Sequence, residues 1–229
     1  MKALQHQDIL DQGLSAMGLD LDLAAKQRLI AYCAELLRWN AKINLVAKAP
    51  LDVIWETHFL DSLTLLRALP APDAALPTLL DIGTGAGFPG LALKTARPDL
   101  PVMLVEPRQK RVSFLKHIIR TIGLSGISVL CGRVEAGNDT VAGTSLRMEL
   151  ITSRAFTNIA GFLHHCAAIS PMGGRVVCMK GPRAEEELTA WRAEQPDSPY
   201  RLEQTISLTL PFSGNLRKLL IFIKEGTTP

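Results

Sequence analysis

The sequence lacks the features that would place the chain in a membrane or in an oxidising compartment. No apolar run approaches the ~20 residues that a membrane-spanning helix needs, and the first residues are too polar for a signal peptide. Only four cysteines occur in 229 residues, and none forms a Cys-x-x-Cys pair. Such isolated cysteines are typical of reduced thiols. We therefore expect a cytoplasmic protein with neither a disulfide framework nor a zinc site.

Metal-binding patterns and a strong charge are missing as well. His164 and His165 are adjacent, so on a helix they would point in different directions and could not share a metal. The net charge of +3 is small, and dedicated nucleic-acid binders are usually more basic. We therefore expect no metal, and composition alone does not indicate an RNA partner. The length fits one domain, at roughly 100–200 residues per domain, and we expect a monomer that binds no membrane.

The hydrophobic pattern of the chain changes near residue 70. Before it, apolar residues recur at helical spacing over residues 29–40 and again over residues 58–69. The segment Leu69-Pro70-Ala71-Pro72 then breaks the helical pattern. We therefore predict an N-terminal helical arm over residues 1–72, packed on a core over residues 73–229.

After this break, short apolar runs alternate with helical segments. Strands are predicted at 78–82, 102–106, 127–130, 150–153 and 175–179, with helices at 88–96, after Pro107, at 161–170 and at 184–193. Two last strands, at 200–210 and 218–224, have no helix between them. Such an order predicts a Rossmann-like α/β fold, with a mostly parallel seven-stranded sheet that ends in a C-terminal antiparallel hairpin. That arrangement is typical of class I methyltransferases, which use S-adenosylmethionine.

A glycine-rich turn follows the first predicted strand. Gly83, Gly85 and Gly87 stand between the strand and its helix, where glycine allows positive φ and the close approach of a ligand. Asp81 lies at the end of this strand, and Glu106 ends the next strand 25 residues later (106 − 81). A carboxylate there can accept hydrogen bonds from both ribose hydroxyls of an adenosine. The turn therefore predicts a site for an adenosine-containing cofactor.

The same turn also matches the dinucleotide pattern G-x-G-x-x-G at Gly85 to Gly90, a weak match when it stands alone. Three features favour S-adenosylmethionine instead: the acidic Asp81 before the first glycine, the Asp-x-Gly-x-Gly-x-Gly spacing, and the terminal hairpin. A nicotinamide dehydrogenase would normally carry a second βαβαβ half, for which this chain is too short. We therefore predict a methyltransferase that converts S-adenosylmethionine to S-adenosylhomocysteine, with a nicotinamide oxidoreductase as an alternative.

The motifs of two common acceptor chemistries are absent. Enzymes that methylate exocyclic amines of bases usually carry Asn/Asp-Pro-Pro-Tyr after the fourth strand, where this chain has Ser153-Arg154-Ala155-Phe156. Enzymes that act on pyrimidine C5 need a nucleophilic cysteine, typically beside proline, and no cysteine here has that context. Guanine N7 has a free lone pair, so an enzyme acting there can work by positioning alone. Both absences are consistent with N7 chemistry without establishing it.

Several segments together resemble one family. They are Arg38 to Leu45 with its Trp-Asn-x-x-x-Asn-Leu pattern, His58 to Leu63, the turn from Asp81 to Gly90, Lys110 to Leu115, Ser153 to Phe156, and Met179 to Gly181. On these segments the chain is similar to the bacterial small-subunit rRNA guanine-N7 methyltransferases, also called glucose-inhibited division protein B. The resemblance implies methylation of one guanine in the 530 loop of 16S rRNA, as naked rRNA, as a 30S subunit or as its precursor.

The resemblance also implies cofactor contacts at Gly83, Phe88, Val134, Glu135 and Arg154. In relatives the acid of the second strand is often Asp followed by Ser, whereas this chain has Glu106-Pro107 and keeps the carboxylate. Together with the glycine turn, the candidate cofactor-binding residues are Asp81, Gly83, Thr84, Gly85, Gly87, Phe88, Glu106, Val134, Glu135 and Arg154. No catalytic residue is predicted.

A basic rim around this pocket is predicted to bind RNA phosphates, which would give a salt-dependent affinity. The candidates are Lys42, Lys48, Arg108, Lys110, Arg111, Lys180, Arg183, Arg217 and Lys218. Trp39 and Trp55 could stack on a flipped base, although Trp39 fits the core at a helix end as well.

Other candidates have a structural interpretation beside the functional one. Phe88 could line the methionine pocket or pack the first helix turn against the core. Arg154 could meet the methionine carboxylate, an RNA phosphate, or only solvent. The polar residues of the arm, Asn40, Asn44, His58 and Asp61, could bridge the arm to the cofactor turn or serve as caps.

Two alternatives for the activity stay open at this point. One is a class I methyltransferase that acts on a different RNA, a protein or a small molecule. The other is a non-catalytic RNA-binding or assembly factor, whose sign would be a broken glycine turn; this turn is intact.

Overall fold

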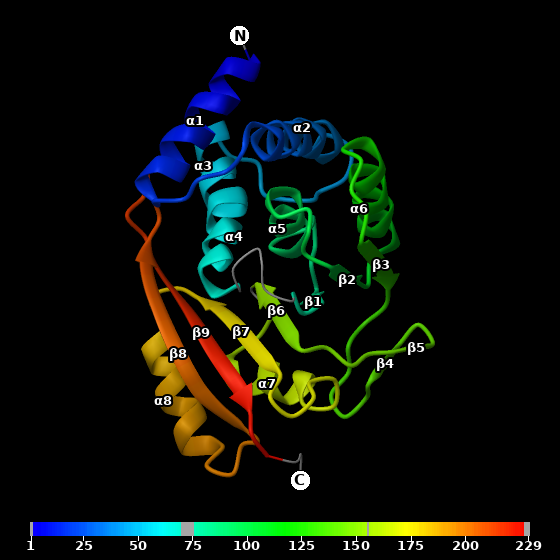
Figure 1. Cartoon of the computed structure of the whole chain (residues 1–229), viewed down its shortest axis with the longest axis vertical. Helices are drawn as coiled ribbons and strands as arrows, with labels where there is room; N and C mark the ends of the chain where they lie inside the picture. Colours follow the sequence, from blue (N-terminus) through cyan, green and yellow to red (C-terminus); the bar gives the residue numbers. More distant parts are fainter. Residues whose placement is uncertain (1, 70–75, 155, 227–229) are drawn as a thin grey trace.

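A seven-stranded sheet forms the centre of the computed structural model, which describes residues 2–69, 76–154 and 156–226 (Figure 1). Its strand order is β3-β2-β1-β6-β7-β9-β8. The strands are β1 (Leu79–Ile82), β2 (Val102–Glu106), β3 (Ile127–Cys131), β6 (Leu150–Arg154), β7 (Arg175–Lys180), β8 (Tyr200–Thr209) and β9 (Leu216–Lys224). Neighbours among the first five are parallel, whereas β9 is antiparallel to β7 and β8. The predicted fold class, with its C-terminal hairpin, is confirmed.

Helices cover both faces of this sheet. One face carries α5 (Gly90–Ala96) and α6 (Gln109–Thr121), and the other carries α7 (Ile159–Cys166) and α8 (Ala184–Glu194). The sequence predicts this helix over residues 161–170, whereas α7 starts two residues earlier and ends four residues earlier. Asn158 caps the start, because its Oδ1 accepts the Gly161 N–H at 2.8 Å. Cap residues of this kind favour a helix start. Two short strands, β4 (Thr140–Val141) and β5 (Thr144–Ser145), form a hairpin that the sequence did not reveal.

The N-terminal residues form helices, as expected. They are α1 (Lys2–Ala16), α2 (Leu23–Asn40), α3 (Leu51–Ile54), the π-helical segment η1 (Trp55–Leu60), α4 (Asp61–Leu63) and the 3₁₀ segment η2 (Thr64–Ala68). The helix predicted to start at residue 58 therefore begins at Leu51. A π-helical turn has i→i+5 bonds instead of i→i+4, so the apolar stripe shifts its phase at η1. Because of that shift, the residues before 58 do not continue the α-helical spacing of apolar residues that predicts the rest of the helix.

The helical arm and the sheet share one hydrophobic cluster. Leu29, Tyr32 and Phe59 of the arm and Leu91 and Phe114 of α5 and α6 all belong to it, and none is more than 1% exposed. Fully burying one such side chain contributes roughly 1.5–3 kcal/mol. The predicted boundary between arm and core, at residues 72 and 73, lies outside the described residues. Within the described part, no helix is long and apolar enough to cross a membrane.

A buried carboxylate ties the arm to the C-terminal hairpin. Glu56, in η1, is 4% exposed, and its Oε1 accepts the N–H groups of Phe212 at 2.6 Å and Ser213 at 2.8 Å. Both N–H groups lie in the turn between β8 and β9. Because a buried donor that loses its partner keeps its desolvation cost, this contact fixes the turn against the arm.

We expect Glu56→Ala to lower the free energy of unfolding by about 2 kcal/mol, because two N–H groups lose a charged acceptor. Urea denaturation measures the change. The matched control is Glu203→Ala, which removes an exposed carboxylate paired with Arg175 and should cost about 0.5 kcal/mol or less. Equal losses in the two variants would contradict the role given to Glu56.

Candidate active site at the carboxyl edge of the sheet

The glycine turn closes around the carboxylate of Asp81. Asp81 is fully buried, and its Oδ2 accepts the Thr84 hydroxyl at 2.6 Å and the Gly90 N–H at 2.8 Å. A Cβ on Gly90 would lie 2.8 Å from the Asp81 Cβ, so only glycine fits at the start of α5. The other oxygen, Oδ1, is buried without a hydrogen-bond partner among the described residues. Burial raises the pKa of Asp81 to about 6.

The three glycines of the turn all need the left-handed region, with φ of +70° at Gly83, +63° at Gly85 and +99° at Gly87. At Gly87 a side chain is also excluded by space, because its Cβ would lie 2.4 Å from the Tyr32 hydroxyl. That hydroxyl donates a hydrogen bond to the carbonyl of Ala86. Tyr32 of the arm thus holds the turn from outside, a role that the sequence pattern did not suggest because the residue falls on the apolar stripe of α2.

Glu106 faces the same turn from the end of β2. Its carboxylate is 2% exposed and accepts two backbone N–H groups, Gly85 at 2.9 Å on Oε2 and Arg108 at 3.0 Å on Oε1. Arg111 Nη1 lies 4.0 Å from Oε2. The first and second strands thus bring two carboxylates to one glycine turn, as the sequence predicts.

Phe88 lies between the turn and the arm. Phe88 is 4% exposed. Its ring stacks on Tyr32 and His58, with ring centroids 5.5 Å and 5.1 Å away, and meets Phe59 edge-on with the centroids 5.0 Å apart. These contacts bear out the packing interpretation of Phe88. Its predicted contact with a cofactor stays a prediction.

Arg154, at the end of β6, reaches toward the arm. It donates to the carbonyl of Thr57, contacts His58 Nδ1 at 3.0 Å, and lies 3.5 Å from Asp61 Oδ2. Its guanidinium also stands over the Phe88 ring at 5.4 Å. Burial lowers the pKa of Arg154, and the charges of Asp61 and Asp81 oppose that shift. The interpretation of Arg154 as a solvated surface arginine is therefore wrong, because its side chain is only 20% exposed.

The polar residues of the arm divide into two groups. Asn40 Oδ1 accepts the N–H groups of Leu45 at 2.8 Å and Val46 at 3.0 Å, so it holds the loop after α2. Asn44 is exposed. His58 and Asp61 do bridge the arm to the site, through Arg154 and Phe88.

Val134 and Glu135 follow β3 and differ in exposure. Val134 is 5% exposed and belongs to the hydrophobic cluster on the α7 and α8 face. Glu135 is exposed, and its backbone carbonyl accepts the Asn138 N–H at 3.2 Å. Neither contradicts the predicted place beside a cofactor.

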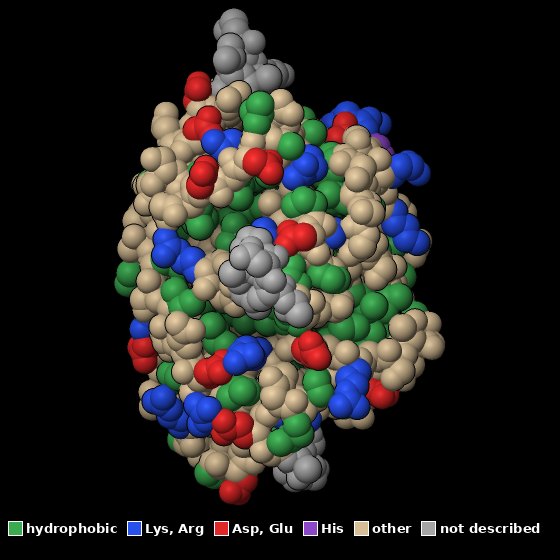
Figure 2. Space-filling view, in the orientation of Figure 1, with side chains coloured by type: hydrophobic (Ala, Val, Ile, Leu, Met, Phe, Trp, Pro, Cys, Tyr) green, Lys and Arg blue, Asp and Glu red, His purple; other side chains and the backbone are tan. Residues whose placement is uncertain are grey.

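The predicted basic rim is interrupted by acidic residues. Lys180 pairs with Glu187 at 2.7 Å, Lys218 with Glu185, and Arg217 with Asp61 at 3.0 Å. The remaining candidates include the exposed Lys42, Lys48, Arg108, Lys110 and Arg183. On the face shown in Figure 2, Lys and Arg side chains are scattered among acidic ones and do not form one patch.

The structure removes one aromatic candidate and offers another. Trp55 is fully buried and donates from Nε1 to His6 Nδ1 at 3.1 Å, so it cannot stack on a base. Trp39 packs on Phe114 at 5.6 Å, as its core interpretation requires. Phe156 is 38% exposed, and a Cβ on Gly83 would lie 3.4 Å from its ring. Its position two residues after the end of β6 is the sequence feature from which this residue could have been predicted.

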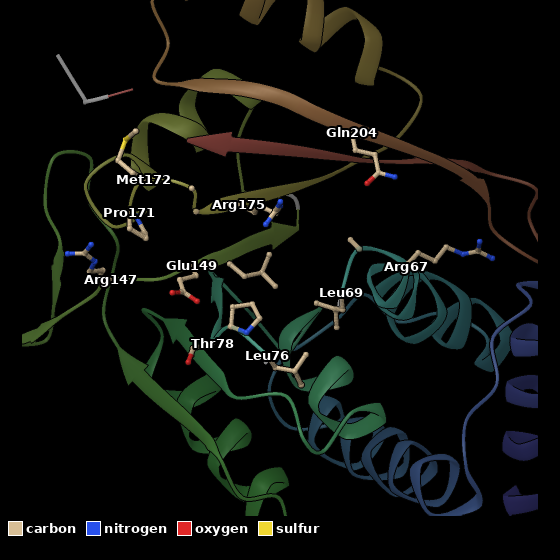
Figure 3. Close-up of a pocket in the computed structure, with 15 residues that line it drawn as sticks. Arg67, Leu69, Leu76, Thr78, Arg147, Glu149, Pro171, Met172, Arg175 and Gln204 are labelled. Carbon is tan, nitrogen blue, oxygen red and sulfur yellow. The ribbon is translucent and has the colours of Figure 1, made fainter. Parts of the chain in front are cut away.

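Two cavities lie at opposite edges of the sheet. A cleft of about 750 Å³ at the carboxyl edge is lined by residues that include Asp61, Arg154, Thr157, Lys180 and Arg217. A larger cavity, of about 970 Å³, lies at the edge where the parallel strands begin, with Thr78, Glu149 and Arg175 around it (Figure 3). Ligands of open parallel sheets bind outside the carboxyl ends of the strands, so the smaller cleft is the candidate site. Of the ten candidate cofactor-binding residues, all within the described ranges, only Arg154 lines this cleft, and the glycine turn lies outside its lining. No group of His, Cys, Asp or Glu in the described ranges could hold a metal ion.

Comparisons with known proteins identify the family. A sequence model described as rRNA small subunit methyltransferase G, GidB, matches residues 25–217. The chain belongs to this family. The curated member from Desulfotalea psychrophila is 45% identical over 93% of this chain and 95% of its own length. The member from Myxococcus xanthus is 40% identical over 98% of this chain and all of its own length.

Solved structures give the fold independently of this family. A methyltransferase from Pyrococcus furiosus superposes with a TM-score of 0.56 at 16% identity, covering 87% of this chain and 98% of that one. A SAM-dependent methyltransferase from Aquifex aeolicus gives 0.52 at 17% identity, covering 75% of this chain and 93% of that one. At these identities the likeness shows the class I methyltransferase fold alone.

Asp81 should give the protein a distinct pH dependence of stability. Burial raises the pKa of Asp81 from its ordinary value of 3.8 to about 6 in the folded chain, so the folded state holds the proton more tightly between these values. The resulting stabilisation is present below pH 4 and is lost as the pH rises through 6, by about 3 kcal/mol at most. Asp81→Asn should lack this loss.

Urea denaturation of the wild type and of Asp81→Asn at pH 4, 5, 6 and 7 measures the difference in slope. Parallel pH profiles for the two proteins would show that Asp81 titrates as an ordinary exposed carboxylate.

Proposed function

We propose that this protein transfers the methyl group of S-adenosylmethionine to N7 of one guanine in the 530 loop of 16S rRNA. Membership of the rRNA small subunit methyltransferase G family supports an rRNA acceptor. Asp81 Oδ1, at the glycine turn, is buried and has no hydrogen-bond partner among the described residues, and this observation supports S-adenosylmethionine as the donor. An rRNA acceptor places the proposed reaction in the cytoplasm, and we propose that the protein works as a monomer.

The residues at the turn fit the donor molecule. Its α-ammonium group would satisfy Asp81 Oδ1, which otherwise bears its full desolvation cost. Its ribose hydroxyls would donate to Glu106, whose carboxylate lies at the end of β2. Gly83, Thr84, Gly85 and Gly87 would let the backbone approach it, and Arg154 would face its carboxylate. Phe88, Val134 and Glu135 complete the proposed set.

The chemistry needs little from the protein beyond placement. Bound S-adenosylmethionine supplies an electrophilic methyl group on a sulfonium sulfur. With this donor bound, the N7 lone pair could accept the methyl group as the S–C bond breaks; the positive charge would pass to the base, and no proton would have to leave. Accordingly, the chain needs no general base, and positioning can supply up to roughly 7–11 kcal/mol of barrier reduction.

We propose Phe156 as the aromatic platform for the acceptor base. It lies at the surface beside Gly83. Its ring packs on Phe162, with ring centroids 5.7 Å apart, and edge to face with His165, with centroids 5.1 Å apart. Aromatic rings of this kind stack on unpaired bases of RNA. The proposed RNA contacts of Lys42, Lys180, Arg183, Arg217 and their neighbours in the basic rim would hold the strand around it.

Methyl transfer from labelled S-adenosylmethionine tests the proposed function. The acceptors are 30S particles and naked 16S rRNA from cells that lack this protein, and the modified base is mapped by N7-specific strand cleavage. We expect one cleaved guanine in the 530 loop, on one or both acceptors. Label at another atom or nucleotide would keep the donor and remove the proposed acceptor. Tight donor binding with no label on either acceptor would remove the RNA substrate altogether.

Phe156→Ala should lower kcat/KM for rRNA about tenfold, because stacking contributes roughly 1–3 kcal/mol per base. The Kd for S-adenosylmethionine should stay unchanged. Phe156→Trp should keep the rate, and Phe212→Ala, which removes a ring of similar exposure at the tip of the hairpin, should be silent. A loss of donor affinity in Phe156→Ala that accounts for the whole rate loss would assign the ring to the donor instead.

A further inference from the structure

One buried carboxylate is shared by two arginines from different strands. Asp61, the first residue of α4, is 5% exposed. Its Oδ1 accepts Arg217 Nε of β9 at 3.0 Å, and its Oδ2 lies 3.5 Å from Arg154 Nη1 of β6. Asp61 therefore joins the arm, the carboxyl edge of the parallel strands and the C-terminal hairpin at one point.

Arg154 is the inner of the two arginines. Besides Asp61, its acceptors are the Thr57 carbonyl and His58 Nδ1. Burial, with the charge of Arg154, lowers the pKa of His58 to about 4. The imidazole is therefore neutral at pH 7 and offers a lone pair to the guanidinium. The Arg154 guanidinium stands 5.4 Å from the centre of the Phe88 ring, which places it on the side of the glycine turn.

Arg217 is the outer arginine. Its side chain is 21% exposed, and besides Asp61 it donates from Nη1 to the carbonyl of Leu216 at 3.0 Å. Both arginines line the cleft of about 750 Å³ together with Asp61, Lys180 and Glu187. Since Lys180 and Glu187 neutralise each other at 2.7 Å, the two arginines and one carboxylate leave one positive charge in this part of the cleft.

A buried ion pair is weak evidence for a role in stability, because desolvation offsets much of its attraction. Asp61 shows that offset, since burial raises its pKa although two guanidinium groups oppose the shift. What the carboxylate does supply is geometry, because it fixes the directions of two guanidinium groups that start from strands at different places in the sheet.

We propose that Asp61 is a positioning residue for methyl transfer: it holds Arg154 toward the donor's carboxylate and Arg217 toward a phosphate of the acceptor RNA. This inference rests on the proposed function. Methyl transfer needs the sulfur, the methyl carbon and N7 in line, and a misplacement of about 1 Å can lower a rate about 100-fold. By tying both anchors to one carboxylate, Asp61 sets the distance between donor and acceptor.

The effects of Asp61→Asn on RNA affinity and on kcat distinguish a positioning role from a purely electrostatic one. Asp61→Asn removes one negative charge from the cleft, so electrostatics alone predicts RNA affinity that is equal or tighter. Positioning predicts that kcat falls about 100-fold while the Kd values for rRNA and donor change less than about threefold. Single-turnover transfer at saturating donor and rRNA, filter binding of rRNA and calorimetric titration of S-adenosylmethionine give the three quantities.

The controls distinguish a role in positioning from a role in folding. Asp61→Glu keeps the charge with a longer reach and should retain the fold, with kcat lowered at least tenfold. In the background of Arg217→Gln, Asp61→Asn should cost much less than in the wild type, because part of its effect acts through Arg217. Glu203→Gln, which frees the exposed Arg175 at the opposite edge of the sheet, should leave all values unchanged.

Wild-type kcat in a folded Asp61→Asn would overturn the inference. If Asp61→Asn does not fold, a wild-type kcat in Asp61→Glu would overturn it equally. These outcomes are distinct from failure of the proposed function, in which the wild-type protein itself would leave both rRNA acceptors unmethylated.

Discussion

The carboxylate of Asp81 is the contact on which the carboxyl edge of the sheet depends. It holds the Thr84 hydroxyl and the Gly90 N–H with one oxygen, and so fixes both ends of the glycine turn on the end of β1. Two other contacts depend on the position of this turn. Glu106 accepts the Gly85 N–H, and the Tyr32 hydroxyl donates to the Ala86 carbonyl. The cost is a buried carboxylate whose other oxygen has no hydrogen-bond partner in the described part of the chain. A cationic ligand group can offset this cost.

The arm contributes to the site as well as to the core. Tyr32, His58 and Phe59 surround the Phe88 ring, while Glu56 and Asp61 reach the C-terminal hairpin. The hairpin and the arm are 156 residues apart at the contact between Asp61 and Arg217, so the cleft is assembled from both ends of the chain. A division into arm and core describes the order of the sequence better than it describes the packing.

The regular parts of this fold follow from the sequence, and the parts that depend on distant contacts do not. Strands β1, β2, β6 and β7 were predictable because each is a short apolar run with a turn or helix on either side. The pairing of Asp61 with Arg217 was not, because nothing local links a helix of the arm to β9. Trp55 shows the same limit: a tryptophan near a basic rim suggested stacking, whereas its partner His6 lies in α1.

The π-helical segment η1 has a consequence for the register of the arm. The N–H of Asp61 bonds to the carbonyl of Glu56, five residues earlier, which brings both side chains to the side of the hairpin. In a regular α-helix, residues five apart are rotated by about 140° about the axis, and the two carboxylates could not face the same strand pair. The wide π-helical turn thus changes the rotation about the helix axis between Glu56 and Asp61. Deleting one residue from it would restore the common helical pitch and turn one of the two carboxylates away, without removing a single charged group.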